Sequence, residues 1–260
     1  MNQLQLFALE SIPEIRPDDD LASVLISAME REGFVPAEGD IFVLAHKVVS
    51  KAEGRIYHLP EVVPSPEAVR LGKITGKPPA LVELILQESE KVLYAAEQGY
   101  LLCQHRLGFV CANAAVDCSN AGDENAILLP LRPDDSAERL RIALEARYHS
   151  RFGAIICDTH GKPFREGASG TVIGASGVCL LKSYIGQEDR DGRVMKSSVE
   201  NVGDELAGAA TLLMGQGREG CPVCIVRGLS ALGSGHASDL IRQTNRDIFL
   251  STFLQKNHLA

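Results

Sequence analysis

The residues best suited to chemistry follow a short apolar run in the middle of the chain. The run, Phe152 to Cys157, is typical of a buried strand, and Asp158 and Thr159 are expected at its end, before a Gly-Lys-Pro turn. A carboxylate and a hydroxyl there can hold a hard cation such as Mg2+ or Mn2+. Lys162 and Arg165 come next and can face phosphate or carboxylate groups. This layout is typical of phosphoryl transfer, and the alternative is a plain surface turn of mixed charge.

A second group of polar side chains also follows an apolar strand. Phe109 to Ala112 is expected to be a strand, and Asp117, Ser119 and Asn120 crowd the segment beyond it. Two strands that each end in an aspartate can share a metal ion if their ends lie together. The alternative is ordinary turn chemistry, because Asp, Asn and Ser form turns by themselves.

Two further segments can receive phosphate groups. Lys47 and Lys51 are expected on a basic loop after the buried strand Ile41 to Ala45, although exposed lysines at such a place also form a solvated edge. A helix expected over residues 198–214 stops at Gly215-Gln-Gly217. Glycine at this place lets backbone amides approach phosphates closely.

Composition narrows the class of protein. The 260 residues suffice for one large domain or two small ones, and a hydrophobic content of 45% is ample for a core. The net charge of −8 argues against nucleic-acid or acidic-membrane partners, which need a basic face. No apolar run approaches the roughly 18 residues of a membrane span. The first five residues lack the basic region of a signal peptide, so a cytoplasmic location is expected.

The cysteines predict neither a disulfide framework nor a metal site. There are seven, an odd number, and most lie in apolar runs, where a free thiol packs as a small hydrophobe. Cys221 and Cys224 have the spacing of a redox pair or half a zinc site, but no second pair follows. We therefore predict core packing for this pair.

The pattern of apolar residues predicts an α/β protein whose elements position these groups. A helix from Leu21 to Glu32 is expected after the cap Asp18-Asp19-Asp20. Asp135 and Glu138 form a capping box that predicts a helix running to about Arg151. The remaining expected elements are a strand within 4–16, helices over 67–76 and 80–90, a strand at 92–94, a strand–turn–strand over 171–181, a strand at 223–226 and a final helical segment from 239.

Four motifs together resemble one family. They are Ile41 to Gly54, Gly108 to Asn120, Asp158 to Gly167 and Asp204 to Gln216, in the order and at about the spacing of the coenzyme F(420)-0:L-glutamate ligases, the gamma-glutamyl ligases of deazaflavin biosynthesis. The likeness runs from about Ile12 to Leu250. It implies the α/β fold of that family, with mixed sheets and packed helices, over residues 1–260 as a single unit. The nitroreductase-like second domain of actinobacterial members is not expected.

The resemblance also implies an activity, cofactors and partners. In this family GTP activates a terminal carboxylate as an acyl phosphate, and the amine of L-glutamate displaces phosphate. The first bond joins glutamate to a deazaflavin precursor, and later ones extend a gamma-linked tail. Two divalent cations, Mn2+ or Mg2+, and a monovalent cation such as K+ serve the site. The protomers interlock as a homodimer.

Site residues carry over from the resemblance motif by motif. Asp117 and Asp158 are expected to hold the first metal and to be essential for catalysis, and Thr159 and Gln216 are expected to help hold the second. The residues expected around GTP are Ile12, Pro13, Glu14, Ile15, His46, Lys47, Lys51, Asn120, Met214, Gly215, Gln216, Gly217, Arg218, Glu219, Gly220 and Cys221.

Several positions differ from the usual sequence motifs of the family. Leu107 stands where His is usual, Ala115 where Gly is usual and Phe164 where Trp is usual. His46 occupies a position where a small residue is common. The metal and GTP positions keep their chemistry, whereas the acceptor could be another carboxylate. A metal-dependent phosphatase or nucleotide hydrolase, or a regulatory nucleotide-binding protein, would fit the same residues.

Overall fold

The computed structural model describes residues 3–243 and 247, and the chain divides into two compact units. The first unit holds residues 1–53 and 130–240, and the second holds 54–129 and 241–260. Each unit is described by itself. The mixed α/β class expected from the sequence is confirmed, while the description as a single unit without a nitroreductase-like domain stays a prediction.

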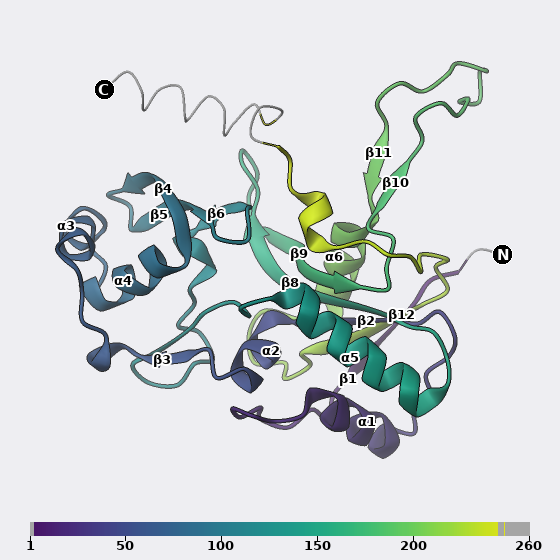
Figure 1. Ribbon diagram of the computed structural model, residues 1–260, viewed down its shortest axis with the longest axis horizontal. Helices are drawn as coiled ribbons and strands as arrows, with labels where there is room; N and C mark the ends of the chain where they lie inside the picture. Colours follow the sequence, from purple (N-terminus) through teal and green to yellow (C-terminus); the bar gives the residue numbers. More distant parts are fainter. Residues whose placement is uncertain (1–2, 244–246, 248–260) are drawn as a thin grey trace. The chain divides into compact units, whose positions relative to one another are not determined.

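A five-stranded sheet forms the centre of the first unit (Figure 1). Its order is β1 (Gln5–Leu9), β12 (Val223–Arg227), β2 (Ile41–Ala45), β8 (Gly153–Gly161) and β9 (Ala168–Ser176). Only β2 and β8 are parallel, and every other neighbouring pair is antiparallel. The carboxyl ends of β2 and β8 therefore meet at one edge of the sheet.

Helices cover both faces of this sheet. Figure 1 shows α5 (Pro133–Tyr148) and α1 (Leu21–Glu32) on one face and α6 (Val202–Met214) behind the other. Glycines on β9 allow the close approach: a Cβ on Gly174 would meet Pro133 of α5, and one on Gly170 would meet Ala207 of α6.

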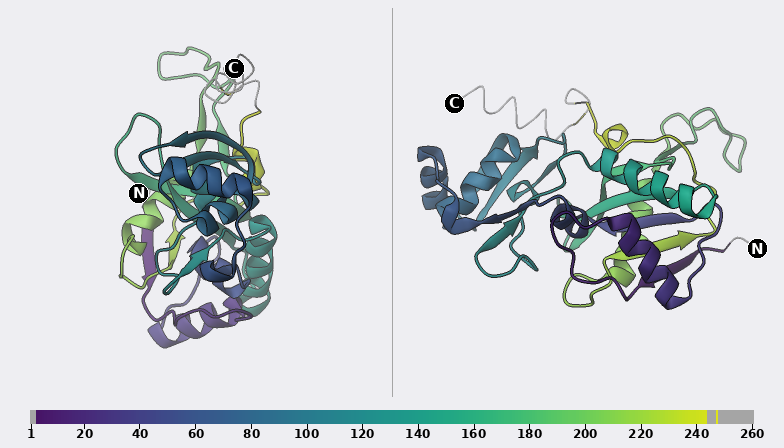
Figure 2. Two further views of the ribbon diagram at one scale, coloured as in Figure 1. Left: turned by 90° about the vertical axis from the view of Figure 1, so that its left-hand side faces the viewer. Right: turned by 60° about the horizontal axis from the view of Figure 1, so that its bottom comes forward.

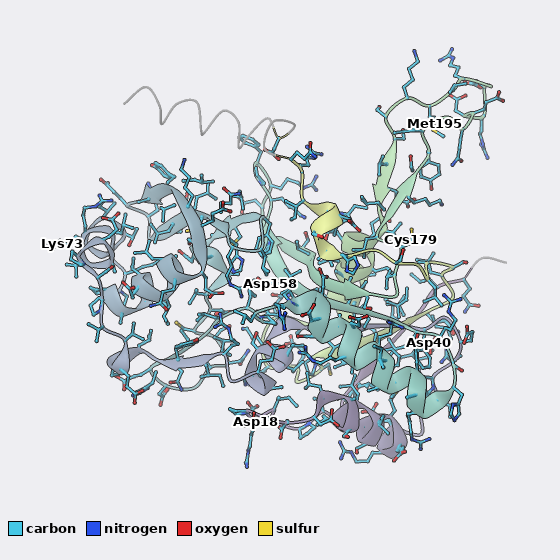
Figure 3. The ribbon with its side chains drawn as sticks, viewed as in Figure 1. Asp18, Asp40, Lys73, Asp158, Cys179 and Met195 are labelled. Carbon is cyan, nitrogen blue, oxygen red and sulfur yellow. The ribbon has the colours of Figure 1, made fainter. Side chains whose placement is uncertain are left out.

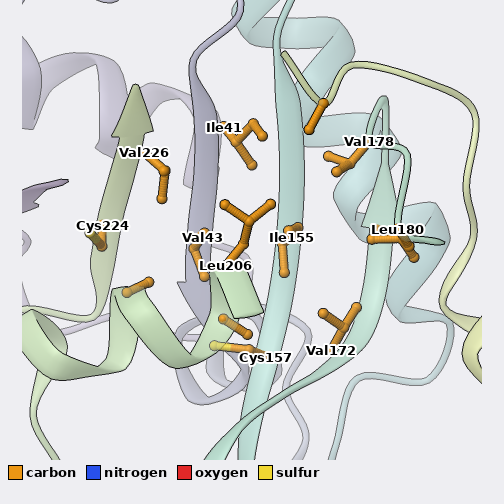
Figure 4. Close-up of a cluster of buried hydrophobic side chains, with 14 of the residues drawn as sticks. Ile41, Val43, Ile155, Cys157, Val172, Val178, Leu180, Leu206, Cys224 and Val226 are labelled. Atoms are coloured by element: carbon orange, nitrogen blue, oxygen red, sulfur yellow. The ribbon is translucent and has the colours of Figure 1, made fainter. Parts of the chain in front are cut away.

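The face toward α6 carries a continuous apolar core (Figure 4). Figure 4 shows Ile41 and Val43 of β2 beside Ile155 of β8, with Leu206 of α6 packed over them. Each of these side chains is buried, which is the main favourable contribution to folding. Cys157 and Cys224 belong to the same cluster, and their burial raises the pKa of the thiols to about 12 and about 11. The core packing predicted for Cys224 is thus confirmed, whereas Cys221 is only half-buried.

A hairpin of β10 (Leu181–Ser183) and β11 (Val199–Asn201) belongs to the same unit. The views of Figures 1 and 2 agree that it stands away from the five-stranded sheet. The first unit also contains α2 (His46–Ala52) and the short 3-10 helix η3 (Ala237–Leu240).

Among its described residues, the second unit contains two small sheets and two helices. A three-stranded sheet has the order β4 (Ser89–Ala96), β5 (Tyr100–His105) and β6 (Val110–Ala112), and a two-stranded sheet joins β3 (Ile56–His58) to β7 (Asn125–Ile127). The helices are α3 (Pro66–Thr75) and α4 (Pro79–Gln87), with 3-10 turns η1 (Leu59–Glu61) and η2 (Asn113–Ala115). Ala68, Val82 and Leu101 are fully buried in its core.

Some predicted boundaries are wrong. The helix expected after a cap at Asp135 begins at Pro133, so Asp135 lies in its first turn and pairs with Arg132 instead of capping it. Asp134 accepts the backbone N–H groups of Ala175 and Ala237. The helix expected from 198 begins at Val202, because Val199–Asn201 pair as β11. The strand expected within 4–16 covers only Gln5–Leu9, and the 171–181 segment forms one long strand and then a loop.

The final helical segment expected from 239 lies almost wholly outside the described residues, apart from the end of η3. Among the described helices, none is long and apolar enough to cross a membrane.

Candidate functional site

The candidate site begins where β2 ends and β8 continues. The last paired residues of the two parallel strands are Ala45 and Cys157, so His46 and Asp158 follow side by side. The prediction that Asp158 and Thr159 terminate their strand is wrong, because β8 runs on to Gly161, paired only with β9. One edge of β8 is therefore free of a strand partner from Asp158 onward. Ligands of α/β proteins bind at such carboxyl ends of parallel strands. In Figure 3, Asp158 and Asp40 mark the two ends of this parallel pair.

Asp158 lies between two imidazoles. His46 Nε2 is 3.5 Å from Asp158 Oδ1, and His160 Nε2 is 3.0 Å from Oδ2. Burial alone would raise the pKa of this carboxyl, but the charge of His46, the hydrogen bond and charge of His160 and the Thr159 N–H lower it to about 2. The carboxylate is thus ionised at neutral pH and fixed in orientation, as a metal ligand requires.

Sequence reasoning did not assign His160. Asp158 and His160 are two residues apart on one strand, so both side chains project from the same face. This period of two was the available signal, and it was missed because the segment was expected to be a turn.

A third segment reaches the same edge from the end of α6. Thr159 Oγ1 donates to Gln216 Oε1 at 3.0 Å, and the Ala45 N–H donates to the carbonyl of Pro222 at 2.9 Å. The structure therefore brings Thr159, next to Asp158, together with Gln216, the two residues expected at the second metal; that they hold a metal stays a prediction. These two contacts close sequence separations of 57 residues (Thr159 to Gln216) and 177 residues (Ala45 to Pro222).

The predicted basic loop is a helix. His46–Ala52 forms α2, in which His46 is buried and its Nδ1 lies 3.3 Å from Ser50 Oγ. Lys47 is half-buried. Lys51 is also mostly buried, and its ammonium contacts Glu14 Oε1 at 2.5 Å. The phosphate contacts predicted for both lysines stay a prediction.

The segment Ile12 to Ile15 is held beside α2. Ile15 is buried and anchors the segment, while Pro13 and Glu14 are exposed. The Asp18 N–H donates to the carbonyl of Ala52 at 2.8 Å, which fastens the following turn to the end of α2. Two of the segments expected around GTP thus lie together within the first unit.

The glycine-rich segment after α6 folds back on itself. Met214 is buried, and Gly215 has a positive φ of 71°. The Gly217 N–H donates to Glu219 Oε2 at 2.8 Å. Arg218 and Gly220 are exposed, whereas Cys221 is half-buried. The segment therefore presents polar backbone at the surface, consistent with the expected phosphate contacts.

Asp117 and Asn120 belong to the second unit, so whether Asp117 shares a metal with Asp158 stays a prediction. Asp117 accepts the Ser119 N–H at 2.7 Å and the Ser119 hydroxyl at 2.9 Å, which is the turn chemistry considered as the alternative. Three successive residues just before it, Asn113 to Ala115, have φ between 47° and 55°. Such backbone strain in residues other than glycine is typical of functional sites.

The donor set fits a hard cation better than a soft one. His46 and His160 face the Asp158 carboxylate, and the other groups near it are hydroxyl and amide oxygens, which together with the carboxylate suit Mg2+ or Mn2+. Within residues 3–243 and 247, no group of three or more His, Cys, Asp or Glu is arranged to hold a metal by itself. A cation here would need oxygen ligands from a substrate as well.

The tip of the β8–β9 hairpin carries the remaining predicted groups. Lys162 Nζ lies 3.9 Å from Asp204 Oδ2 of α6, so its charge is partly offset. Phe164 is exposed and has a φ of 60°. The Arg165 N–H donates to the carbonyl of Lys162 at 3.2 Å, which closes the turn.

Comparisons with known proteins identify the family to which the chain is similar. The family described as F420-0:Gamma-glutamyl ligase matches residues 10–228. A coenzyme F420:L-glutamate ligase of Methanopyrus kandleri is 44% identical over 257 residues, covering 96% of this chain and all of that protein. Proteins of the same description from Archaeoglobus fulgidus and Methanothermobacter thermautotrophicus are each 41% identical, over 95% of this chain and 96% and 98% of their own lengths.

Proposed function

The chain belongs to the F420-0:gamma-glutamyl ligase family, and from this premise we propose that it is a GTP-dependent ligase. Its reaction would join L-glutamate to the terminal carboxylate of a deazaflavin precursor and extend a gamma-glutamyl tail. The relatives named as coenzyme F420:L-glutamate ligases support the substrates. The observation that carries the chemistry is the contact between Thr159 and Gln216 beside the ionised Asp158.

The proposed reaction has two steps. An oxygen of the acceptor carboxylate attacks the terminal phosphorus of GTP, and the bond from that phosphorus to its bridging oxygen breaks, releasing GDP. The amine of L-glutamate then attacks the acyl carbon, and the bond to the phosphate oxygen breaks. An amide, inorganic phosphate and one proton from the amine result.

The chain's own residues have distinct roles in this proposal. Asp158 supplies a fixed negative charge, and His46 and His160 hold its orientation. In this proposal Lys51 of α2 and the backbone amides after Gly215 contact the nucleotide phosphates; the positive φ of Gly215 supports this role for the amides. Asp158, Thr159 and Gln216, together with Asp117, would hold two divalent cations. Such cations neutralise the charge that develops on the attacking and leaving oxygens.

The interlocked homodimer and the assisting monovalent cation are also part of this proposal. They rest on the family resemblance.

Phosphate release tests the class of reaction. A ligase releases phosphate from GTP only when both acceptor and L-glutamate are present. Release that needs neither would identify a nucleotide hydrolase, and tight GTP binding without turnover would identify a regulatory binding protein. Replacing the deazaflavin precursor by other carboxylates in the same assay tests whether the acceptor is the one proposed.

A further inference from the structure

Two carboxylates of the chain bind donor groups that are proposed to bind the phosphates of the nucleotide. The first is Glu14, whose Oε1 contacts the Lys51 ammonium at 2.5 Å. Glu14 is 76% exposed, whereas Lys51 is only 12% exposed. The lysine is thus held at the surface of the site by a carboxylate that is itself free to move into solvent.

The second carboxylate is Glu219, at the end of the glycine-rich segment. Its Oε2 accepts the Gly217 N–H at 2.8 Å, and the carboxylate lies directly over Gly215, where any Cβ would collide with it. The backbone N–H groups of Glu219 itself and of Gly217 lower the pKa of this carboxyl. Glycine at 215 is therefore needed for the carboxylate to sit in this turn of the backbone.

Both contacts are of a kind that a polyphosphate can replace. An ammonium group or a backbone amide donates to a phosphate oxygen as readily as it donates to a carboxylate oxygen. Both carboxylates are exposed, and contacts of exposed charged side chains are weak, so releasing Glu14 from Lys51 and Glu219 from the Gly217 N–H costs little. A nucleoside triphosphate carries several negative charges and regains both contacts, whereas an uncharged nucleoside regains neither.

We propose that Glu14 and Glu219 are internal anions that hold Lys51 and the Gly217 amide in the free protein and yield them to the phosphates of the nucleotide. This inference rests on the proposed function, since it requires that the site binds GTP. If the inference holds, each of the two glutamates lowers the affinity of the protein for the nucleotide.

The test is calorimetric titration of the full chain with a non-hydrolysable GTP analogue in the presence of Mg2+. The variants are Glu14→Gln, Glu219→Gln and the double variant, with Glu10→Gln as a matched control. Glu10 lies just before the Ile12–Ile15 segment, and in the described part of the chain it contacts neither Lys51 nor Gly217. Guanosine serves as the ligand without phosphates.

Each single variant should bind the analogue about two- to five-fold more tightly than the wild type, the effect of one weak ion pair. The double variant should show the larger gain, while guanosine binding and the Glu10→Gln variant should not change. Weaker binding by Glu14→Gln or Glu219→Gln would contradict the inference, because the carboxylate would then support its donor in the complex. An equal gain with Glu10→Gln would also contradict it, by attributing the effect to net charge.

The outcome also separates this inference from the proposed function. Wild-type protein that binds the analogue, with unchanged binding by the variants, refutes the inference alone. A wild type and variants that all fail to bind the analogue refute both.

Discussion

His160 Nε2 lies 3.0 Å from Asp158 Oδ2, and the two side chains project from the same face of β8. His46 approaches the other carboxylate oxygen, so the metal-binding aspartate proposed here is oriented from two sides. Groups that orient a metal ligand commonly affect metal affinity or activity by about 10- to 100-fold when they are removed.

The variant His160→Ala should therefore lower turnover by about 10- to 100-fold and raise the Mg2+ or Mn2+ concentration needed for half-maximal activity. The measurement is a metal titration of ligase activity, with thermal unfolding to verify the fold. His58→Ala is a suitable control, because His58 is exposed and pairs with Asn125 on β7. A loss of activity with an unchanged metal requirement would argue against the orienting role.

Asp158→Asn and Asp117→Asn should each abolish ligation while leaving the fold intact. An amide keeps the shape of the side chain but lacks the charge that holds a divalent cation. Activity measured at limiting metal decides the point, with circular dichroism as the check on folding. Near-normal turnover by either variant would refute its place in the metal site. Asp135→Asn, which removes an exposed ion pair with Arg132, should leave ligase activity unchanged.

The local elements of the fold were predictable wherever side chains determine the backbone. Asp20 caps α1 by accepting the Ala22 N–H, and Gly33 ends it with a positive φ, so Leu21–Glu32 follows from the sequence alone. The length of β8 does not follow from the sequence, because Asp158 and Gly161 are poor strand formers and only the pairing with β9 extends the strand beyond Cys157.

The candidate site was predictable as a set of residues but not as contacts. The pairing of Lys51 with Glu14, of Thr159 with Gln216 and of Gly217 with Glu219 depends on how distant or flexible segments fold back. The start of α5 was misplaced for another reason, because the predicted cap Asp135 lies inside the helix and pairs with Arg132. The neighbouring Asp134 accepts backbone N–H groups 41 and 103 residues away, contacts that no local pattern reveals.

Ala115→Gly should stabilise the protein. Ala115 has a φ of 55°, a backbone conformation that costs a residue with a Cβ about 1–2 kcal/mol and that glycine adopts without strain. Part of the gain is lost because glycine makes the unfolded chain more flexible. We expect a net gain of up to about 1 kcal/mol, measured by urea unfolding. Ala112→Gly, at φ −75°, should instead be neutral or destabilising.

Glu88 should make the stability of the second unit depend on acid pH. Burial would raise its pKa, but the His105 imidazole 3.5 Å away, the hydrogen bond from Arg55 and the charges of Arg55 and Arg106 outweigh this and lower it to about 2. A carboxyl with a lowered pKa in the folded state stabilises the protein above its unfolded value of 4.5. That stabilisation is lost as the pH falls from 4.5 toward 2.

Glu88→Gln should accordingly lower the free energy of unfolding at pH 7 by roughly 1–3 kcal/mol, since two arginines lose a buried charged partner. The difference from wild type should shrink at pH 3, as measured by urea unfolding at both pH values. Glu67→Gln, which removes an exposed pair with Arg70 in the same unit, should have little effect. A difference independent of pH would show that the charge of Glu88 is not what stabilises the unit.

The central claim is that this chain forms an amide bond at the expense of GTP. It is tested most directly by incubating the protein with GTP, L-glutamate, Mg2+ or Mn2+ and the deazaflavin precursor, and by reading the masses of the products. The account predicts a precursor that has gained one or more glutamates, with one GDP and one phosphate for each bond. GDP and phosphate without any glutamate conjugate, on this or another carboxylate acceptor, would contradict it.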